Sequence, residues 1–268
     1  MIRTDFHVHT SFSSDSDTPM EQMIEAAIDK GLEAICFTEH MDYHYPETDG
    51  MTFVFDPEAY HKKIDQMQLA YGAQIQILRG VELGLSEDMR NEGEKLLKNY
   101  PFDFVIGSQH LLDHKDPYYA AFWEGYDPKD RIRQWYQEMA RNIEAFPKLD
   151  TLGHLDYISR YIPGGPAAYA SGDFKEEIDA ILREIICHDI CLEINTNAYR
   201  YDANGPHPLP EVIQRYFDLG GKNLTIGSDA HVPEHLAQEY DRTEEILRNL
   251  GAKGHCIFSK RKRIHLTF

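Results

Sequence analysis

Short apolar runs alternate with longer amphipathic stretches along the whole chain. The runs lie at residues 2–9, 33–40, 74–82, 102–110, 150–156, 191–195 and 223–231. Each run has the length of a strand, and the stretches between the runs are long enough for helices. This alternation is typical of a parallel sheet covered by helices. The sequence therefore predicts an α/β fold with seven strands, and single barrels of this class span about 250 residues.

Capping residues mark the ends of the predicted helices. Thr18, Pro19 and Glu21 are typical of a helix N-terminus with Thr18 as the cap, and Gly31 ends that helix. Asp56 begins a second helix in the same way. Further helices are expected at 86–99, 128–146, 173–188, 208–219 and 233–250. Because no linker-like stretch interrupts this pattern, residues 1–268 are predicted to form a single domain.

The net charge of −18 argues against a nucleic-acid-binding protein, because phosphate backbones are bound by basic surfaces. The basic run "KRKR" at 260–263 is short and is expected to be a solvated terminal strand. No signal peptide precedes Met1 and no apolar run reaches membrane-spanning length, so a cytoplasmic protein without membrane attachment is expected. Cys187 and Cys191 are expected to be small buried residues.

Histidines and carboxylates stand at the ends of six of the seven predicted strands. Residues i and i+2 of a strand face the same way, so His7 and His9 can contact one ion. The other strand ends carry His40, Glu82, His110, His154, Asp229 and His231. The C-terminal ends of barrel strands meet at one mouth, where these side chains are expected to gather. Imidazole and carboxylate ligands suit zinc, iron and manganese, so a metal centre is predicted there.

Two long loops, 41–56 and 112–130, are acidic and aromatic, and each follows a predicted strand. Loops in this position lie at the mouth of a parallel barrel. Their carboxylates and rings suit a cationic, ring-bearing substrate. His44, His114 and His207 lie in loops on the same face, where a contact with substrate is an open alternative.

The motifs at the strand ends resemble those of the polymerase-and-histidinol-phosphatase (PHP) family. The matching stretches are, in order, "HVHTSFSSDS", "FTEH", "GVELG", "GSQHLL", "GHLDY" and "GSDAH". They run from the first predicted strand to the seventh and so cover most of the chain. The resemblance implies a distorted (β/α)7 TIM-like barrel with two or three divalent ions (Zn, Fe or Mn) at its C-terminal mouth.

The same resemblance implies three groups of metal ligands. The first ion would be held by His7, His9, Glu82 and Asp229. Glu82 would bridge to a second ion, held also by His110 and His154. The third ion would be held by Asp15, His40 and His231. Asp15 keeps the family's spacing from "HVHT", whereas Asp17, two residues later, is an alternative ligand or a catalytic acid.

A site that holds several divalent ions carries much positive charge, which favours a phosphate group as its ligand. Such ions activate water to hydroxide at neutral pH and neutralise phosphoryl charge during in-line attack. Arg160 and Arg200 lie just past strand ends, and arginine binds two phosphate oxygens at once. This combination resembles the histidinol-phosphatase branch of the family, which hydrolyses the small phosphorylated substrate L-histidinol phosphate to L-histidinol and phosphate in histidine biosynthesis.

Several roles stay open at this point. The proton for the leaving alkoxide is expected from Asp229, His231 or Asp17. Glu193 and Asn195 share one face of the sixth strand and are interpreted as substrate contacts or as supports of the metal ligands. Alternative functions are the hydrolysis of another small phosphoester or a nucleotide, a polymerase-associated exonuclease, which the acidic charge disfavours, and a non-catalytic metal-binding module.

Overall fold

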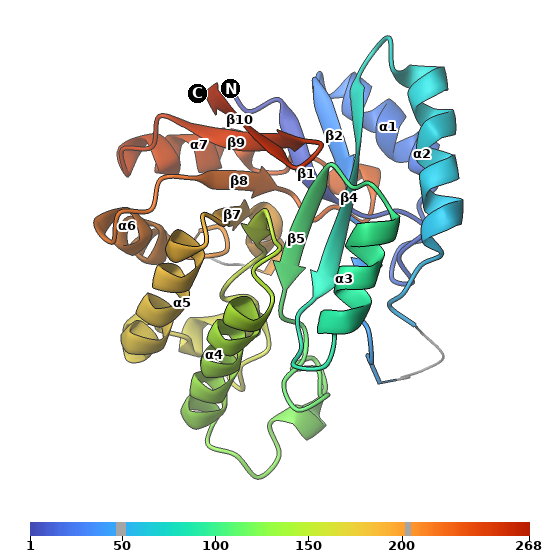
Figure 1. The fold of residues 1–268 in the computed structure, drawn as a ribbon. Coiled ribbons are helices and arrows are strands. Elements are labelled where there is room, and N and C mark those ends of the chain that lie inside the picture. The colour runs from blue at the N-terminus through green and yellow to red at the C-terminus, as the bar shows by residue number, and fades with distance from the viewer. Residues whose placement is uncertain (47–51, 202–204) are drawn as a thin grey trace.

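The computed structural model describes residues 1–46, 52–201 and 205–268. Its main sheet is parallel, with the strand order β1-β2-β4-β5-β6-β7-β8 (Figure 1). These strands are β1 (Thr4–Val8), β2 (Ala34–Phe37), β4 (Gln76–Gly84), β5 (Phe104–Ser108), β6 (Thr151–Leu152), β7 (Cys191–Asn195) and β8 (Leu224–Gly227). They follow the seven predicted runs in order. A short strand, β3 (His40–Met41), also pairs with β4 and aligns His40 with Glu82.

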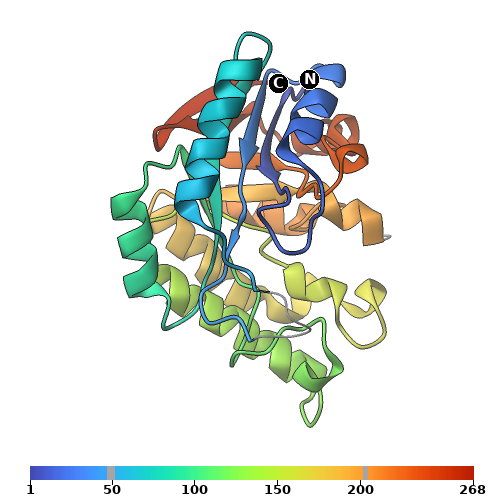
Figure 2. The same ribbon diagram turned by 90° about the vertical axis from the view of Figure 1, so that its right-hand side faces the viewer.

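Helices alternate with the strands along the sequence and cover the outside of the sheet (Figures 1 and 2). They are α1 (Met20–Asp29), α2 (Pro57–Tyr71), α3 (Arg90–Asn99), α4 (Pro128–Ala145), α5 (Lys175–Cys187), α6 (Pro210–Asp218) and α7 (Tyr240–Asn249). Asp56 caps α2 as predicted, because its carboxylate accepts hydrogen bonds from the amides of Glu58 and Ala59. The prediction that Thr18 caps α1 is wrong. Its hydroxyl donates instead to the backbone oxygen of His231.

Three smaller predictions also need correction. The predicted helix 233–250 begins later, at α7, because Ala237 and Glu239 have positive φ angles that interrupt a helix. The predicted helix 86–99 begins only at α3. Cys191 is buried as expected, but Cys187, the last residue of α5, is exposed. Within the described residues, no helix is both long and apolar enough to span a bilayer.

The sheet curves until β1 and β8 nearly meet, which gives the TIM-like barrel that was predicted. Val8 and Ala230 form a single parallel bridge across this seam. Asp5, fully buried on β1, accepts hydrogen bonds from the amides of Ser228 (2.9 Å) and Ala237 (3.0 Å). A buried carboxylate thus fixes the segment after β8 against the first strand. The two ends of the sequence therefore contribute to the same edge of the barrel mouth.

A hairpin that the sequence pattern did not predict, β9 (Gly254–Ser259) and β10 (Lys262–Thr267), covers the barrel end opposite the mouth (Figure 1). Its two turn residues have φ angles of 50° and 60°, which non-glycine residues rarely adopt. The turn is held because Asp103 accepts hydrogen bonds from both of its amides. Phe258 of β9 packs on Phe104, with ring centroids 5.3 Å apart, and so closes the core at this end.

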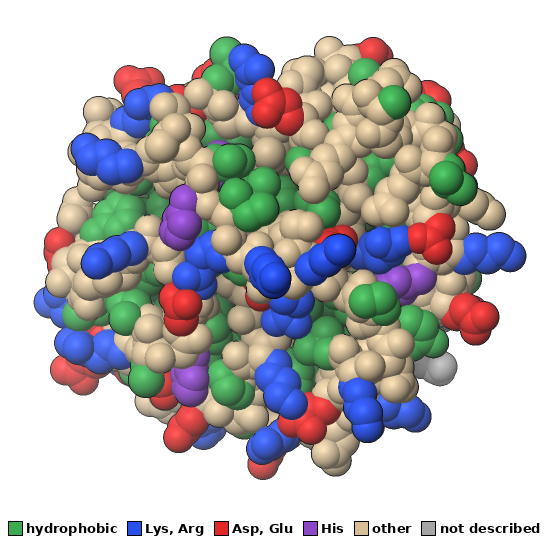
Figure 3. Space-filling view, turned by 45° about the horizontal axis from the view of Figure 1, so that its top comes forward, with side chains coloured by type: hydrophobic (Ala, Val, Ile, Leu, Met, Phe, Trp, Pro, Cys, Tyr) green, Lys and Arg blue, Asp and Glu red, His purple; other side chains and the backbone are tan. Residues whose placement is uncertain are grey.

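The "KRKR" run is the tip of this hairpin, and basic side chains cross the face shown in Figure 3. Lys262 is exposed, which agrees with the expectation of a solvated strand. Arg261 and Arg263, however, form ion pairs with Asp150 and Asp189. These arginines therefore attach the hairpin to the barrel.

The pH dependence of protein stability tests the burial of His255, a residue of β9. Burial lowers the pKa of His255 to about 4, and its Nε2 lies 3.1 Å from the Thr4 hydroxyl. As the pH falls, the unfolded chain binds a proton near pH 6.5 whereas the folded chain does not, so stability is lost between about pH 6.5 and 4. From pH 7 to pH 5 this group is expected to remove about 2 kcal/mol from the free energy of unfolding.

Urea unfolding of wild type and His255→Gln at both pH values measures this effect. The glutamine keeps a polar atom near Thr4 but cannot titrate. The variant should therefore lose about 2 kcal/mol less than wild type over this interval. The same pH dependence in both proteins would contradict the assignment.

Candidate metal centre

Glu82 lies at the centre of a buried cluster at the C-terminal end of β4. Its Oε2 atom is 3.1 Å from Nε2 of His7, 3.3 Å from Nε2 of His9 and 3.1 Å from Nδ1 of His40. The side chains of Glu82, His7 and His9 are completely buried. The bridge of β3 to β4 and the seam between β1 and β8 bring these residues to one point.

The second oxygen of Glu82 faces two further histidines. Its Oε1 atom lies 2.9 Å from Nε2 of His154 and 3.4 Å from Nε2 of His110. His110 is held from behind by Asp42, whose Oδ1 atom lies 2.6 Å from the histidine Nδ1. Asp42 comes two residues after His40 and was not identified from the sequence. Its position directly after a strand-end histidine could have indicated a residue of the site.

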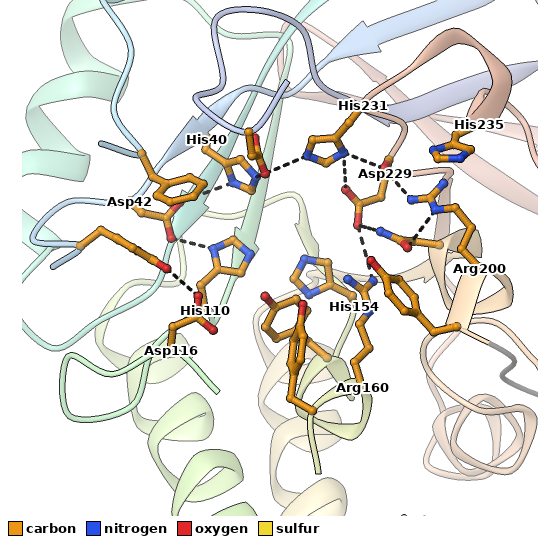
Figure 4. A pocket seen from close by; sticks show the side chains of 17 residues that line it. His40, Asp42, His110, Asp116, His154, Arg160, Arg200, Asp229, His231 and His235 are labelled. Carbon is orange, nitrogen blue, oxygen red and sulfur yellow. Dashed lines mark hydrogen bonds and ion pairs between the residues drawn. The ribbon is translucent and has the colours of Figure 1, made fainter. Parts of the chain in front are cut away.

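Asp229 and His231 (Figure 4) complete the cluster together with Asp15, whose side chain is 33% exposed. The Asp229 Oδ1 atom lies 3.5 Å from Nε2 of His9 and 3.7 Å from Nδ1 of His231. Asp15 Oδ2 lies 3.4 Å from Nε2 of His40 and 3.1 Å from Nε2 of His231. Asp15 lines the pocket described below and contacts two histidines, whereas Asp17 does not line it, so the geometry favours Asp15 as the ligand.

The cluster fits divalent metal ions. Within the described part of the chain, four of its buried atoms have no hydrogen-bond partner: Nε2 of His7, Nε2 of His9, Nδ1 of His40 and Oε2 of Glu82. Each such atom costs about 1–3 kcal/mol when it stays unsatisfied. Ligand atoms around one tetrahedral zinc ion lie about 3.4 Å apart, given bonds of about 2.0–2.1 Å. The separations of 3.1 Å and 3.3 Å from Glu82 to His7 and His9 are close to that value.

The cluster also keeps its carboxylates ionised. Burial alone would raise the pKa of Glu82, but His7 and His40 lower it well below its usual value. The pKa of Asp229 is likewise lowered well below its usual value, against the effect of burial, by His7 and His231. Burial lowers the pKa of His9 to about 3, so its imidazole is neutral. Anionic carboxylates and neutral imidazoles are the forms that bind metal ions. Against the effect of burial, neighbouring carboxylates raise the pKa values of His7, His40 and His110, so metal binding at these rings would displace a proton.

Other buried groups orient these side chains from outside. Glu193 Oε1 lies 2.6 Å from Nδ1 of His7, and its second oxygen accepts a hydrogen bond from the amide of His154. On the other side, Ser13 joins His9 to the buried Glu39: its hydroxyl lies 3.1 Å from His9 Nδ1 and 2.6 Å from Glu39 Oε2. Such contacts fix the direction in which the opposite ring nitrogen points.

Neither Glu193 nor Asn195 lines the pocket. Asn195 Nδ2 lies 3.2 Å from a Glu193 oxygen and 3.5 Å from Asp229 Oδ2. Of the two interpretations of these residues, the geometry favours support of the metal ligands over contact with substrate. Asn197, which the sequence did not single out, does line the pocket and donates to Asp229 Oδ2 at 2.6 Å.

A pocket of about 290 Å³ opens over the cluster (Figure 4). The predicted loops do reach it: Tyr45 and Phe53 come from one, and Asp116 from the other. Tyr45 donates a hydrogen bond to Asp116 across the two loops (2.5 Å). Residues 47–51 of the first loop lie outside the described residues. His44 and His114 do not line the pocket.

Both predicted arginines line the pocket, but their environments differ. Arg160 has a 5% exposed side chain, and its Nη2 atom, 3.6 Å from Asp229 Oδ2, has no hydrogen-bond partner among the described residues. Arg200 donates instead to Asn197 Oδ1 and to the backbone oxygens of Ser228 and Asp229. Arg160 is therefore available to an anion, whereas Arg200 mainly holds the segment after β8.

Residues 5–197 match the family model of the PHP domain. The chain belongs to the PHP family. Two PHP relatives match along nearly their whole length. The probable histidinol-phosphatase of Clostridium acetobutylicum is 32% identical over 96% of this chain and 97% of its own. The histidinol-phosphatase of Lactococcus lactis subsp. lactis is 28% identical, with coverages of 98% and 96%.

Two solved structures resemble this PHP fold. One is the histidinol phosphate phosphatase of Lactococcus lactis subsp. lactis in complex with zinc, L-histidinol and phosphate. It has a TM-score of 0.88 and 28% identity and covers 98% of both chains. The other, a putative histidinol phosphatase of Listeria monocytogenes, has a TM-score of 0.75 over 89% of this chain and 99% of its own. At 19% identity it supports the fold alone.

Proposed function

We propose that this protein is a metal-dependent phosphomonoesterase that hydrolyses L-histidinol phosphate to L-histidinol and inorganic phosphate in cytoplasmic histidine biosynthesis. One observation carries the proposal: Arg160, whose buried Nη2 atom has no hydrogen-bond partner among the described residues, lines the same pocket as the carboxylate–histidine cluster. The likeness to a phosphatase crystallised with zinc, L-histidinol and phosphate supports the choice of substrate. The net charge of −18 makes a nucleic acid a poor partner.

The proposed metal ligands are the three groups implied by the resemblance to the PHP family. They are His7, His9, Glu82 and Asp229; Glu82, His110 and His154; and Asp15, His40 and His231. When bound, divalent ions would lower the pKa of water and neutralise negative charge on the phosphoryl oxygens. Glu193 and Asp42 orient His7 and His110 for this task through their Nδ1 atoms.

The remaining pocket residues bind and orient the ester. Arg160 lines the pocket and donates from its guanidinium to a phosphoryl oxygen. Of the three candidate proton donors, Asp17 does not line the pocket and Asp229 is held as an anion, so His231, which lines the pocket, is the proposed donor. The other wall carries Asp116 and aromatic side chains, a surface that suits a cationic amine and an imidazole ring.

Steady-state hydrolysis of a panel of phosphomonoesters by the metal-loaded protein tests the substrate. L-histidinol phosphate should have the highest kcat/KM, and two partial analogues separate its features: ethanolamine phosphate lacks the ring, and 3-(imidazol-4-yl)propyl phosphate lacks the amine. Each is expected to lose at least about tenfold, since each omits one recognised group. A sugar phosphate or a nucleotide with the highest kcat/KM would contradict the substrate and leave the family and the metal centre untouched.

A further inference from the structure

Arg160 is held from behind by a buried histidine. Its Nε atom donates a hydrogen bond to Nε2 of His207 at 3.2 Å, and its guanidinium stacks on the rings of Tyr157 and Tyr201, 5.0 Å from each centroid. These contacts engage the Nε atom and place two aromatic rings beside the guanidinium. They leave its terminal nitrogens directed toward Asp229 and the pocket.

The contact with Arg160 fixes the proton on His207. An arginine N–H can only donate, so His207 Nε2 must accept and the ring proton must reside on Nδ1. That nitrogen lies 2.5 Å from Oδ1 of Asp156, which has no exposed surface. The other Asp156 oxygen accepts a hydrogen bond from the amide of Leu209 (3.1 Å). The Asp156 carboxylate thus selects the ring form that can accept from Arg160.

The backbone of His207 is also fixed. Its amide and carbonyl exchange hydrogen bonds with Asn195 at the end of β7 (2.8 and 2.7 Å). The series of hydrogen bonds from Asp156 through His207 to Arg160 therefore extends from the end of a barrel strand to the wall of the pocket. Nothing in it extends into the pocket except Arg160, because neither Asp156 nor His207 lines it.

We propose that Asp156 and His207 form a positioning pair that holds Arg160 in the orientation needed to bind the phosphoryl group. The proposal rests on the proposed phosphatase function. In this proposal the pair affects phosphate binding only through Arg160. Neither residue of the pair contacts the substrate.

Two variants of His207 separate this role from a general role in packing. His207→Asn retains an amide near Nδ1, where it can donate to Asp156, but has no atom near Nε2. His207→Gln extends its oxygen to the position of Nε2 and restores an acceptor for Arg160. The asparagine variant is expected to lose about 10- to 100-fold in kcat/KM and in affinity for inorganic phosphate, since it removes a hydrogen bond to a charged group. The glutamine variant should recover most of that loss.

A double-mutant cycle with Arg160→Ala tests whether the effect passes through the arginine. In the Arg160→Ala background, His207→Asn should cause no further loss, within about twofold. Equal losses for the asparagine and glutamine variants, or losses that add fully to that of Arg160→Ala, would overturn the proposal. Melting temperature and metal content, measured in parallel, identify variants that simply fail to fold.

Asp156→Asn provides a second, independent route to the same result. Loss of the carboxylate releases the ring proton to Nε2, where it opposes the Arg160 N–H, so phosphate affinity should fall although His207 is intact. Phosphate affinity is measured by calorimetry on the metal-loaded protein. It therefore remains informative even when the panel identifies a substrate other than L-histidinol phosphate, and a failure of the positioning pair is distinguishable from a failure of the proposed function.

Discussion

Replacing Glu82 with glutamine is expected to lower kcat for L-histidinol phosphate about 1000-fold, equivalent to about 4 kcal/mol. The reason is its position: the two carboxylate oxygens face five imidazole rings, those of His7, His9, His40, His110 and His154. Glutamine keeps the shape of the side chain but removes its charge and one of its two ligand oxygens. The variant should therefore also bind at least one metal equivalent less than wild type.

Elemental analysis of reconstituted protein gives the metal content directly. Wild type should hold at least two equivalents, and a lower value would contradict a multinuclear centre. Asp150→Asn is the matched control, because Asp150 is also a buried carboxylate but pairs with Arg261 of the hairpin, at the other end of the barrel. This control is expected to lower stability and leave the metal content unchanged. Full metal content and activity in Glu82→Gln would disprove the bridging role.

Replacing Arg160 with alanine is expected to lower kcat/KM about 100- to 1000-fold without loss of metal. Its side chain is almost fully buried, and its terminal nitrogen has no hydrogen-bond partner within the described residues, so an anion in the pocket gains a charged donor that is already desolvated. Arg160→Lys should restore little of this, since lysine lacks the planar fork and the Nε donor to His207. The inhibition constant of inorganic phosphate measures the binding part of the effect.

Arg200→Ala is the informative comparison. Its guanidinium bonds the backbone oxygens of Ser228 and Asp229, so its removal loosens a proposed metal ligand as well as the pocket wall. We therefore expect Arg200→Ala to lower metal retention during dialysis, whereas Arg160→Ala does not. Loss of metal from both variants, or from Arg160→Ala alone, would contradict this division between the two arginines.

Much of the fold was predictable because strands and helices leave local patterns in the sequence. The seven parallel strands and the cap at Asp56 follow from such patterns. The hairpin β9–β10 did not, because its turn uses lysine and arginine at positive φ angles and depends on Asp103, more than 150 residues away in the sequence. Thr18 was misassigned for the same reason, since its partner is the distant His231.

The residues of the site also fall into those that local sequence patterns predict and those that only the folded structure brings into contact. Residues at strand ends, such as His7 and Glu82, were predictable because the barrel fixes where strand ends meet. Asp42 and the pair Asp156 and His207 lie in loops or turns, and their roles depend on contacts across the mouth. Sequence spacing does not determine such contacts. The difference between Arg160 and Arg200 likewise emerges only from which of their donors are already occupied.

The seam between β1 and β8 has a consequence for the entropy of the chain. The first proposed ion would join His7 to Asp229, and would therefore close a loop that contains most of the 268 residues. An ion in that position acts as a cross-link, and cross-links over long loops remove the most freedom from an unfolded chain that keeps them. Such an ion would add a reversible link between the two halves of the sequence, beside the bridge of Val8 to Ala230 and the hydrogen bonds of Asp5.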